Sequence, residues 1–203
     1  MKNVVSGVKS TKERILDSAL DLFSEKGYDG VGVDLIAANC GLKGPSIYKH
    51  FKGKEEILDI LIERIEFYYE ENFGTQQFPG KIPDTMQELV ESSLKRIEFT
   101  MHDELIKKTR RILSMEQFRN KKIARIASFH NFESIHGLYK KIFEQMIKNK
   151  VIKQVDAEFL SMSFIMPVSI FIQICDREPD REEELMKKIK QYFIEFSQEY
   201  GLK

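Results

Sequence analysis

Proline, glycine and cysteine are all scarce in this sequence. Its 203 residues include only five prolines and eleven glycines, which leaves long segments without a helix breaker, so we expect a fold that is nearly all helix. The two cysteines, Cys40 and Cys175, stand alone in apolar surroundings, with neither the C-x-x-C spacing of a metal site nor the density of a disulfide-rich protein. They are therefore expected to be buried thiols of a cytoplasmic protein.

Motifs that carry catalysis are also missing. The sequence has no Gly-rich phosphate loop, no nucleophile elbow and no pair of histidines on one helical face, since its four histidines are scattered. We accordingly expect neither an enzyme nor a cofactor. The first ten residues lack the apolar run of a signal peptide, and we expect them to form a loose basic arm.

Charge is unevenly distributed, although the formal net charge is zero. Residues 1–54 contain nine Lys or Arg and six Asp or Glu, a balance of 9 − 6 = +3, so residues 55–203 balance at 23 − 26 = −3. Residues 41–54 contain four lysines and no acid, a local charge of +4. Such a cluster favours contact with nucleic-acid phosphates, and the alternative is a solvated rim.

The amino-terminal part of the chain has the pattern of a helix-turn-helix. The S-x-x-E spacing of Ser10 and Glu13 predicts a capped helix start, and Gly27 predicts the end of that helix. A second short helix is expected over residues 33–40, and a third begins with Pro45 in its first position. Two short helices joined by a glycine-containing turn form a helix-turn-helix, whose second helix enters the DNA major groove.

Residues 11–62 resemble the DNA-binding domain of the tetracycline-repressor (TetR) family through the strings LFSEKGYDG, DLIAANCGL and SIYKHFKGKEEIL. The resemblance implies an all-α fold of about nine helices, with a helix-turn-helix domain in residues 1–54 and a helical effector-binding and dimerisation domain in residues 55–203. It also implies a homodimeric, ligand-responsive transcriptional repressor that binds a palindromic operator on double-stranded DNA.

The same resemblance assigns roles around the third helix. The residues implied to contact phosphates or base edges are Lys43, Gly44, Pro45, Ser46, Tyr48, Lys49, His50 and Lys54. Two positions depart from the family's pattern. Gly32 stands where a threonine commonly caps the second helix and touches phosphate, and Gly44 stands where a lysine or arginine is frequent. We expect each glycine to remove one contact from the DNA-reading surface.

The rest of the chain is expected to be helical. A helix from Lys54 to about Phe73 joins the two domains, and residues 74–83, GTQQFPGKIP, form a loop. Further helices are expected from an Asp84 cap to about Met101 and over residues 104–127, 129–149, 159–175 and 181–200. Residues 107–125 contain eight Lys or Arg and one acid, Glu116. A solvated basic face is the main interpretation, and attraction to DNA or to an anionic ligand group is the alternative.

The uncharged run FLSMSFIMPVSIFIQIC, residues 159–175, reaches the lower limit for a membrane span. Pro167, three serines and Gln173 favour instead a helix enclosed by its own domain and a second subunit, without a membrane. Together with residues 181–200 it resembles the helix pair through which the TetR family dimerises. The expected interface residues are Ile170, Ile174, Leu185, Ile189, Phe193 and Phe196. A membrane-associated helical protein is the alternative.

Aromatic residues are numerous beyond the DNA-binding domain. We expect them to line a pocket for a small, largely apolar and lipophilic effector, although most could instead be core. The expected pocket residues are Phe67, Tyr68, Phe99, Phe118, Phe132, Tyr139, Phe143, Phe164 and Phe171. A metal-binding protein is a further alternative, because His130 and Glu133 lie three residues apart. His136 lies about 120° away around a helix, so we expect no metal site.

Overall fold

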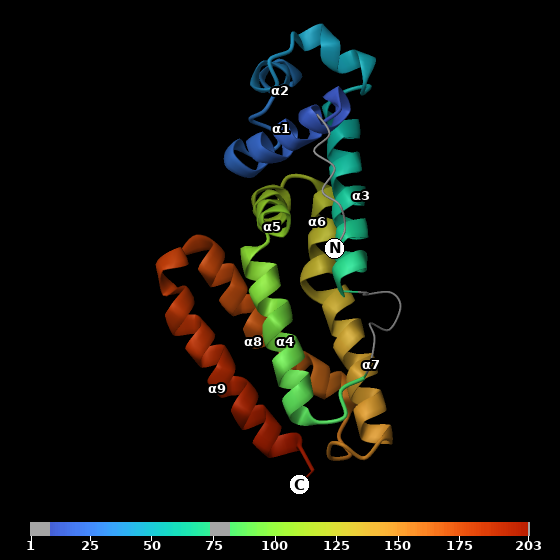
Figure 1. Ribbon diagram of the computed structural model, residues 1–203, viewed down its shortest axis with the longest axis vertical. Helices are drawn as coiled ribbons and strands as arrows, with labels where there is room; N and C mark the ends of the chain where they lie inside the picture. Colours follow the sequence, from blue (N-terminus) through green and yellow to red (C-terminus); the bar gives the residue numbers. More distant parts are fainter. Residues whose placement is uncertain (1–8, 74–81, 203) are drawn as a thin grey trace.

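The computed structural model describes residues 9–73 and 82–202, and the regular elements within them are helices (Figure 1). They are α1 (Thr11–Lys26), α2 (Val33–Asn39), η1 (Gly44–Lys49), α3 (Lys54–Phe73), α4 (Met86–His102), α5 (Glu104–Glu116), α6 (Lys121–Ser128), η2 (Phe129–Glu133), α7 (Ser134–Lys148), α8 (Ala157–Arg177), η3 (Pro179–Arg181) and α9 (Glu182–Tyr200). The predicted all-α class is confirmed. Helices α1 and α2 lie at one end of an elongated molecule, and α7 and α9 reach the other end.

Helix α1 begins and ends as its local chemistry predicts. The Ser10 hydroxyl accepts a hydrogen bond from the Glu13 backbone N–H at 3.2 Å, and the Glu13 carboxylate accepts one from the Ser10 N–H at 2.9 Å. This reciprocal pair satisfies two donors that an uncapped helix leaves open. Gly27 follows the last turn with φ of 76°, a conformation that favours glycine.

Three details differ from the sequence-based expectation. Helix α4 is capped by Thr85, whose hydroxyl accepts from the Glu88 N–H at 3.1 Å, whereas the backbone N–H of Asp84 donates to the Glu88 carboxylate. The helix over Gly44–Lys49 is a 3-10 helix, and Phe129–Glu133 forms a π-helical turn before α7. Both are variants of the backbone hydrogen bonding that apolar periodicity does not distinguish. The expected arm and loop fall largely on residues 1–8 and 74–81, which lie outside the described residues.

Two clusters of buried side chains form the interior. The first comes from α1, α2, η1 and α3 as far as Ile62, and it also contains Ile112 and Leu113 of α5 and Ile123 and Ala127 of α6. The second comes mainly from α4, α7, α8 and α9. Helices α5 and α6 thus complete the core of the amino-terminal helices, and the domain boundary expected at residues 54 and 55 stays a prediction.

Pro167 lies inside α8 without interrupting it. Because proline has no N–H, the carbonyl of Ser163 one turn earlier lacks its helical donor. The hydroxyl of Tyr192 in α9 donates a hydrogen bond to that carbonyl. The proline is therefore accommodated by a polar contact that also joins α8 to α9.

Candidate DNA-binding surface and ligand cavity

The short helix η1 packs its apolar side on the protein core and exposes its polar side to solvent. Ile47 is fully buried and Phe51 nearly so, which fixes the helix on the first core cluster. Tyr48, by contrast, leaves 59% of its surface exposed. Of the other predicted DNA-contacting residues, Lys43, Pro45, Lys49 and His50 are exposed, and Gly44, Ser46 and Lys54 are half-buried. Exposed tyrosine and lysine side chains on one short helix provide the hydroxyl and ammonium donors that contact DNA phosphates.

The turn before η1 is held by hydrogen bonds from α1. Ser18 donates to a backbone carbonyl of α2 at 3.2 Å and accepts from the Asn39 amide at 2.9 Å. The Arg14 guanidinium donates to the carbonyl of Cys40, whose thiol donates to the carbonyl of Arg14 at 3.3 Å. Both cysteines are buried and free, as predicted. These contacts fix α2 and the beginning of the following turn on α1.

The two glycine departures have structural counterparts. Gly32 is the cap residue of α2, which has no side-chain cap hydrogen bond. A side chain at Gly44 would place its Cβ 1.9 Å from the Oδ1 atom of Asp34, in the first turn of α2. Since that distance is far below contact, the carboxylate of Asp34 would have to move before a lysine or arginine could stand at residue 44.

Lys54 faces the protein. Its Nζ atom donates to the carbonyl of Tyr28 at 2.8 Å and lies 4.1 Å from the centre of the Tyr28 ring. This contact ties the first residue of α3 to the turn after α1. The DNA contact implied for Lys54 stays a prediction, and the structure gives the side chain a second role inside the domain.

The basic run of residues 107–125 connects helices. Lys108 pairs with Asp21 of α1 at 2.7 Å, and Lys122 pairs with Asp59 of α3. Arg110 pairs with Asp176 of α8. Of the other five cations, Lys107 is half-buried and Arg111, Arg119, Lys121 and Arg125 are exposed. Three of the eight therefore join α5 and α6 to neighbouring helices, in addition to any role as a solvated face.

Glu116, the acid within that run, links α5 to the amino-terminal helices. It is 1% exposed, and its Oε1 atom accepts the backbone N–H of Tyr28 at 2.9 Å. A Cβ atom at Gly27 would lie 2.8 Å from the same oxygen. The end of α5 is therefore seated directly against the turn that follows α1.

A cavity of about 140 Å³ lies among α4, α5, η2, α7, α8 and α9. Its apolar lining consists of Ile97, Leu113, Ile135, Tyr139, Phe164, Ile165, Val168, Ile172 and Phe193. Its polar lining consists of Arg96, Thr100, Thr109, Arg110, His130, Asn131, Ser169 and Gln173. An apolar chamber with a few polar groups is typical of sites for small molecules.

Two of the nine expected pocket residues, Tyr139 and Phe164, line this cavity. The other seven lie outside its lining: Phe67, Tyr68, Phe99, Phe118, Phe132, Phe143 and Phe171. Phe67 and Phe118 are 65% and 89% exposed, and Phe143 is fully buried against Phe164 in the second core cluster. The presence of an aromatic side chain did not by itself distinguish residues of the cavity wall from residues of the core or the surface. The polar lining, including Arg96, was missed because no sequence motif marks it.

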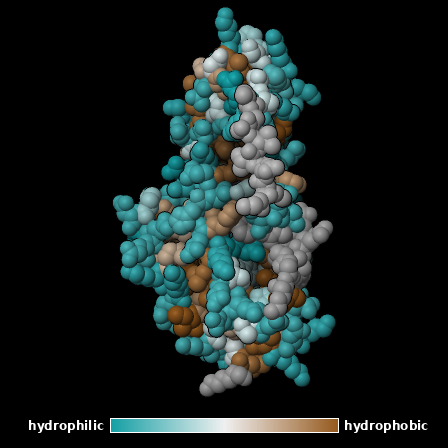
Figure 2. All heavy atoms as spheres, in the orientation of Figure 1, coloured by the Kyte–Doolittle hydropathy of each residue, from teal (hydrophilic) through white to brown (hydrophobic). Residues whose placement is uncertain are grey.

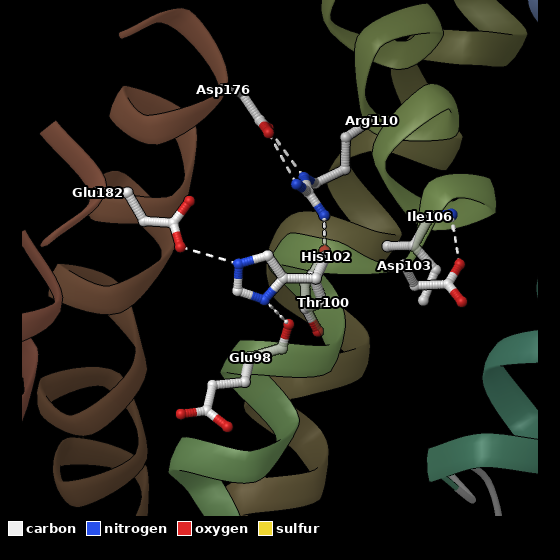
Figure 3. Close-up of polar contacts among 8 residues, drawn as sticks. All are labelled: Glu98, Thr100, His102, Asp103, Ile106, Arg110, Asp176 and Glu182. Atoms are coloured by element: carbon white, nitrogen blue, oxygen red, sulfur yellow. Dashed lines mark hydrogen bonds and ion pairs between the residues drawn. The ribbon is translucent and has the colours of Figure 1, made fainter. Parts of the chain in front are cut away.

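Arg110 lines the cavity, and its charge is compensated by the carboxylate of Asp176 (Figure 3). Its Nε and Nη2 atoms donate to the two carboxylate oxygens of Asp176 at 2.8 and 2.7 Å, and Nη1 donates to the carbonyl of Thr100. Nearby, the Nε2 atom of His102 lies 2.8 Å from a carboxylate oxygen of Glu182. These contacts hold α4, α5, α8 and α9 together around the cavity.

Burial shifts the pKa values of other ionisable groups in the cavity lining. Burial lowers the pKa of His130, so its imidazole is neutral near pH 7. Burial also lowers the pKa of Arg96, although a guanidinium stays charged at that pH. The pKa of Tyr139 is raised chiefly by burial, and its hydroxyl donates to Ser93 at 2.8 Å. The described residues contain no cluster of three or more His, Cys, Asp or Glu side chains placed to hold a metal ion.

Helix α8 carries an apolar stripe on its outer face. Phe159, Met162, Met166 and Ile170, spaced three, four and four residues apart, are each 41% to 52% exposed. Figure 2 shows a largely hydrophilic face with separate hydrophobic patches, several of them in its lower half. By length and composition alone α8 could also cross a membrane, and a third of its most apolar window (33%) is buried.

The expected interface residues separate into two groups. Ile170 is exposed and Ile174 is half-buried. Leu185, Ile189, Phe193 and Phe196 are instead buried in the second core cluster of their own subunit, and Phe193 also lines the cavity. These four side chains of α9 therefore pack within their own subunit, and the interface role expected for them stays a prediction. The stripe of Phe159, Met162, Met166 and Ile170 is exposed on α8, and Ile194 is 48% exposed on α9.

The sequence of the chain is similar to those of known bacterial regulators. The family described as "Bacterial regulatory proteins, tetR family" matches residues 15–61. The chain is similar to the biofilm operon icaADBC HTH-type negative transcriptional regulator IcaR of Staphylococcus epidermidis, with 32% identity over 125 residues that cover 47% of this chain and 68% of that regulator.

Among solved structures, the chain is similar to SmeT, the repressor of the Stenotrophomonas maltophilia multidrug efflux pump SmeDEF. The TM-score is 0.70 at 18% identity, over 96% of this chain and 92% of SmeT. The SmeT–triclosan complex gives a TM-score of 0.72 at 19% identity, over 96% and 93% of the two chains. At such identities the likeness shows a shared fold.

Proposed function

The chain belongs to the tetR family of bacterial regulatory proteins, and from this premise we propose that it is a cytoplasmic, homodimeric transcriptional repressor that releases its operator when a small, largely apolar molecule enters the cavity. The observation that carries the proposal is the joint geometry of η1 and α5. Helix η1 presents Tyr48 and Lys49 outward from a buried anchor, and α5 extends from the cavity to the base of the same domain.

The DNA contact is proposed to be symmetric. A dimer of a helix-turn-helix protein places two reading helices in successive major grooves, so the operator is expected to be a palindrome with half-sites about one helical turn apart or slightly more. Tyr48 and His50 would contact phosphates, and Lys43, Pro45 and Lys49 would approach base edges or the flanking phosphates.

The second subunit is proposed to cover the α8 stripe. Burying apolar surface is worth about 25 cal/mol per Å², so an uncovered row of large side chains favours association. Ile170→Glu should shift the native mass from a dimer of 2 × 23.8 = 47.6 kDa towards the 23.8 kDa subunit. Phe118→Glu, a matched change at an exposed residue away from α8, should leave the dimer intact. A stable wild-type monomer at micromolar concentration would contradict the proposed assembly.

The route from ligand to DNA is proposed to run through α5. This helix contributes Thr109, Arg110 and Leu113 to the cavity and places Glu116 against Tyr28. Phe67 and Tyr68 of α3, which the sequence predicted as pocket residues, lie outside the cavity lining. A shift of α5 by an ångström or two would move the amino-terminal helices relative to the partner's. The ligand must bind the non-DNA-binding arrangement more tightly to drive release.

DNA binding is tested with fragments selected from genomic DNA by the purified protein. Tyr48→Ala and Lys49→Ala should each weaken binding, and Lys49→Ala should reduce the slope of log K against log salt by about 1. Lys190→Ala, at an exposed lysine of α9, is the matched control and should change neither quantity. Wild-type affinity in both η1 variants would refute the assignment of this surface.

A further inference from the structure

We propose that the effector is an uncharged aromatic compound of one ring, carrying one group that both donates and accepts hydrogen bonds, as a carboxamide does. Its ring lies against the aromatic wall of the cavity, and its polar group pairs with Ser169 and Gln173 of α8. This inference rests on the proposed function of the cavity and specifies its ligand. Three properties of the cavity lead to it: its volume, its walls and its unpaired polar groups.

The volume limits the ligand to about one ring. The cavity measures about 140 Å³. An apolar protein cavity of about 150 Å³ holds a benzene molecule. A single substituted ring therefore fills the cavity as it stands, whereas a larger body would require the helices to separate.

The walls favour a flat, apolar body. Tyr139 and Phe164 line the cavity with ring centres 5.1 Å apart, and Phe164 stacks on Phe193 at 4.4 Å with an interplanar angle of 10°. Branched aliphatic residues complete the wall. Aromatic pairs at such separations gain energy beyond the area they bury, which gives a ring an advantage over an aliphatic group of equal size.

The hydrogen-bonding groups that are open to a ligand are uncharged. Among the described residues, the side chains of Thr100, Asn131, Ser169 and Gln173 line the cavity and make no hydrogen bond to the protein. Ser169 and Gln173 are half-buried and stand four residues apart in α8, so they lie on one face of that helix. A hydroxyl and a carboxamide each donate and accept. A ligand group that does both can pair with them without breaking a contact of the fold.

The charged groups of the lining are already engaged. Asp176 pairs with Arg110 through two hydrogen bonds (Figure 3), and Arg96 also has an interaction partner within the protein. His130 is neutral near pH 7, and the described lining contains no acid. An anion would have to draw an arginine away from an existing contact, and a cation would find no counter-charge. The lining therefore favours an uncharged ligand.

Apolar and polar lining residues follow one another along α8. Phe164 and Val168 precede Ser169, Gln173 lies one turn after it, and Asp176 follows in the next turn. Ser169 comes five residues after Phe164, a rise of about 7.5 Å along the helix axis. One ring with one planar substituent covers such a distance. The ring can therefore lie beside Phe164 while its polar group reaches Ser169 and Gln173.

The test is calorimetric titration of the purified full chain without DNA, using five probes. Benzamide represents the proposed class. Benzoate and benzamidine have nearly the same shape with a negative and a positive charge, toluene has the ring without a polar group, and heptanamide has the carboxamide on an aliphatic chain. Benzamide is expected to bind at least tenfold more tightly than benzoate, benzamidine or toluene, and at least threefold more tightly than heptanamide. A smaller preference over any of them, or no binding of benzamide, would overturn the proposal.

The contact with Gln173 is tested by substitution. Gln173→Leu replaces the carboxamide by an apolar group of similar size and should weaken benzamide at least tenfold. Toluene should bind this variant within twofold of wild type, which also shows that the cavity is intact. Gln191→Leu, at an exposed glutamine of α9 outside the cavity lining, is the matched control and should leave both affinities unchanged. Unchanged benzamide binding in Gln173→Leu would refute the contact, and the five wild-type titrations decide the ligand class even where a variant does not fold.

Operator binding is measured separately on the same preparations. Benzamide binding without any operator binding would refute the proposed repressor function and leave the ligand class standing. Operator binding with no benzamide binding would do the reverse.

Discussion

Replacing Arg110 by methionine should destabilise the protein more than any loss of an exposed charge. The side chains of Arg110 and Asp176 are 11% and 18% exposed, and they form two hydrogen bonds of 2.8 and 2.7 Å. The substitution leaves the carboxylate of Asp176 buried without its guanidinium. Breaking such a buried pair costs about 3–5 kcal/mol, and the residual exposure places the expected loss near 3 kcal/mol. For a chain of this size that corresponds to a fall in Tm of roughly 6–12 °C.

The measurement is urea and thermal unfolding at one fixed subunit concentration, because dimerisation makes stability depend on concentration. Arg111→Met is the matched control, since Arg111 is the exposed neighbour on the same helix, and it should change the free energy of unfolding by less than about 0.5 kcal/mol. Asp176→Leu added to Arg110→Met should restore much of the loss, because two apolar groups leave no unpaired charge.

The double-mutant cycle decides whether the reasoning holds. Contacting residues in one pair give coupling free energies of about 0.5–3 kcal/mol. A loss below about 1 kcal/mol for Arg110→Met, or strictly additive effects of the two substitutions, would show that the pair does not hold α5 to α8 as the structure implies.

Three further predictions concern other contacts. Ser10→Ala removes the cap of α1 and should lower the free energy of unfolding by about 1 kcal/mol in urea titrations, and no change would contradict the capping box. The hydrogen bond to Asp103, together with burial, raises the pKa of Tyr68 to about 12 from 10. The fold stabilises the neutral phenol, so the contribution of Tyr68 to the free energy of unfolding is complete below pH 10 and is lost as the pH rises through 12. The excess stability of wild type over Tyr68→Phe should therefore shrink between these two pH values. A constant difference would refute the raised pKa. Glu116→Ala leaves the half-buried N–H of Tyr28 without its acceptor and should cost about 1 kcal/mol in the same titrations, whereas Glu116→Gln keeps an acceptor oxygen and should cost less.

The sequence by itself determined the elements whose causes are local. The Ser10 and Glu13 cap depends on residues three positions apart, and the positive φ of Gly27 depends on the residue itself. The position of η1 follows in the same way from Pro45 at its start. The family resemblance of residues 11–62 rests on such local strings, and the all-α class follows from the scarcity of breakers.

Only the tertiary structure decided which apolar and charged residues meet. Helical periodicity shows that α9 has an apolar face, but not that this face covers its own subunit while the α8 stripe stays exposed. Phe118 and Phe143 are the same residue type, yet one is exposed and the other fully buried. The pairing of Arg110 with Asp176 joins residues 66 positions apart, and that of Glu116 with Tyr28 joins residues 88 positions apart. Such contacts depend on how whole helices pack. The residue pattern along one helix does not show which other helix it will pack against.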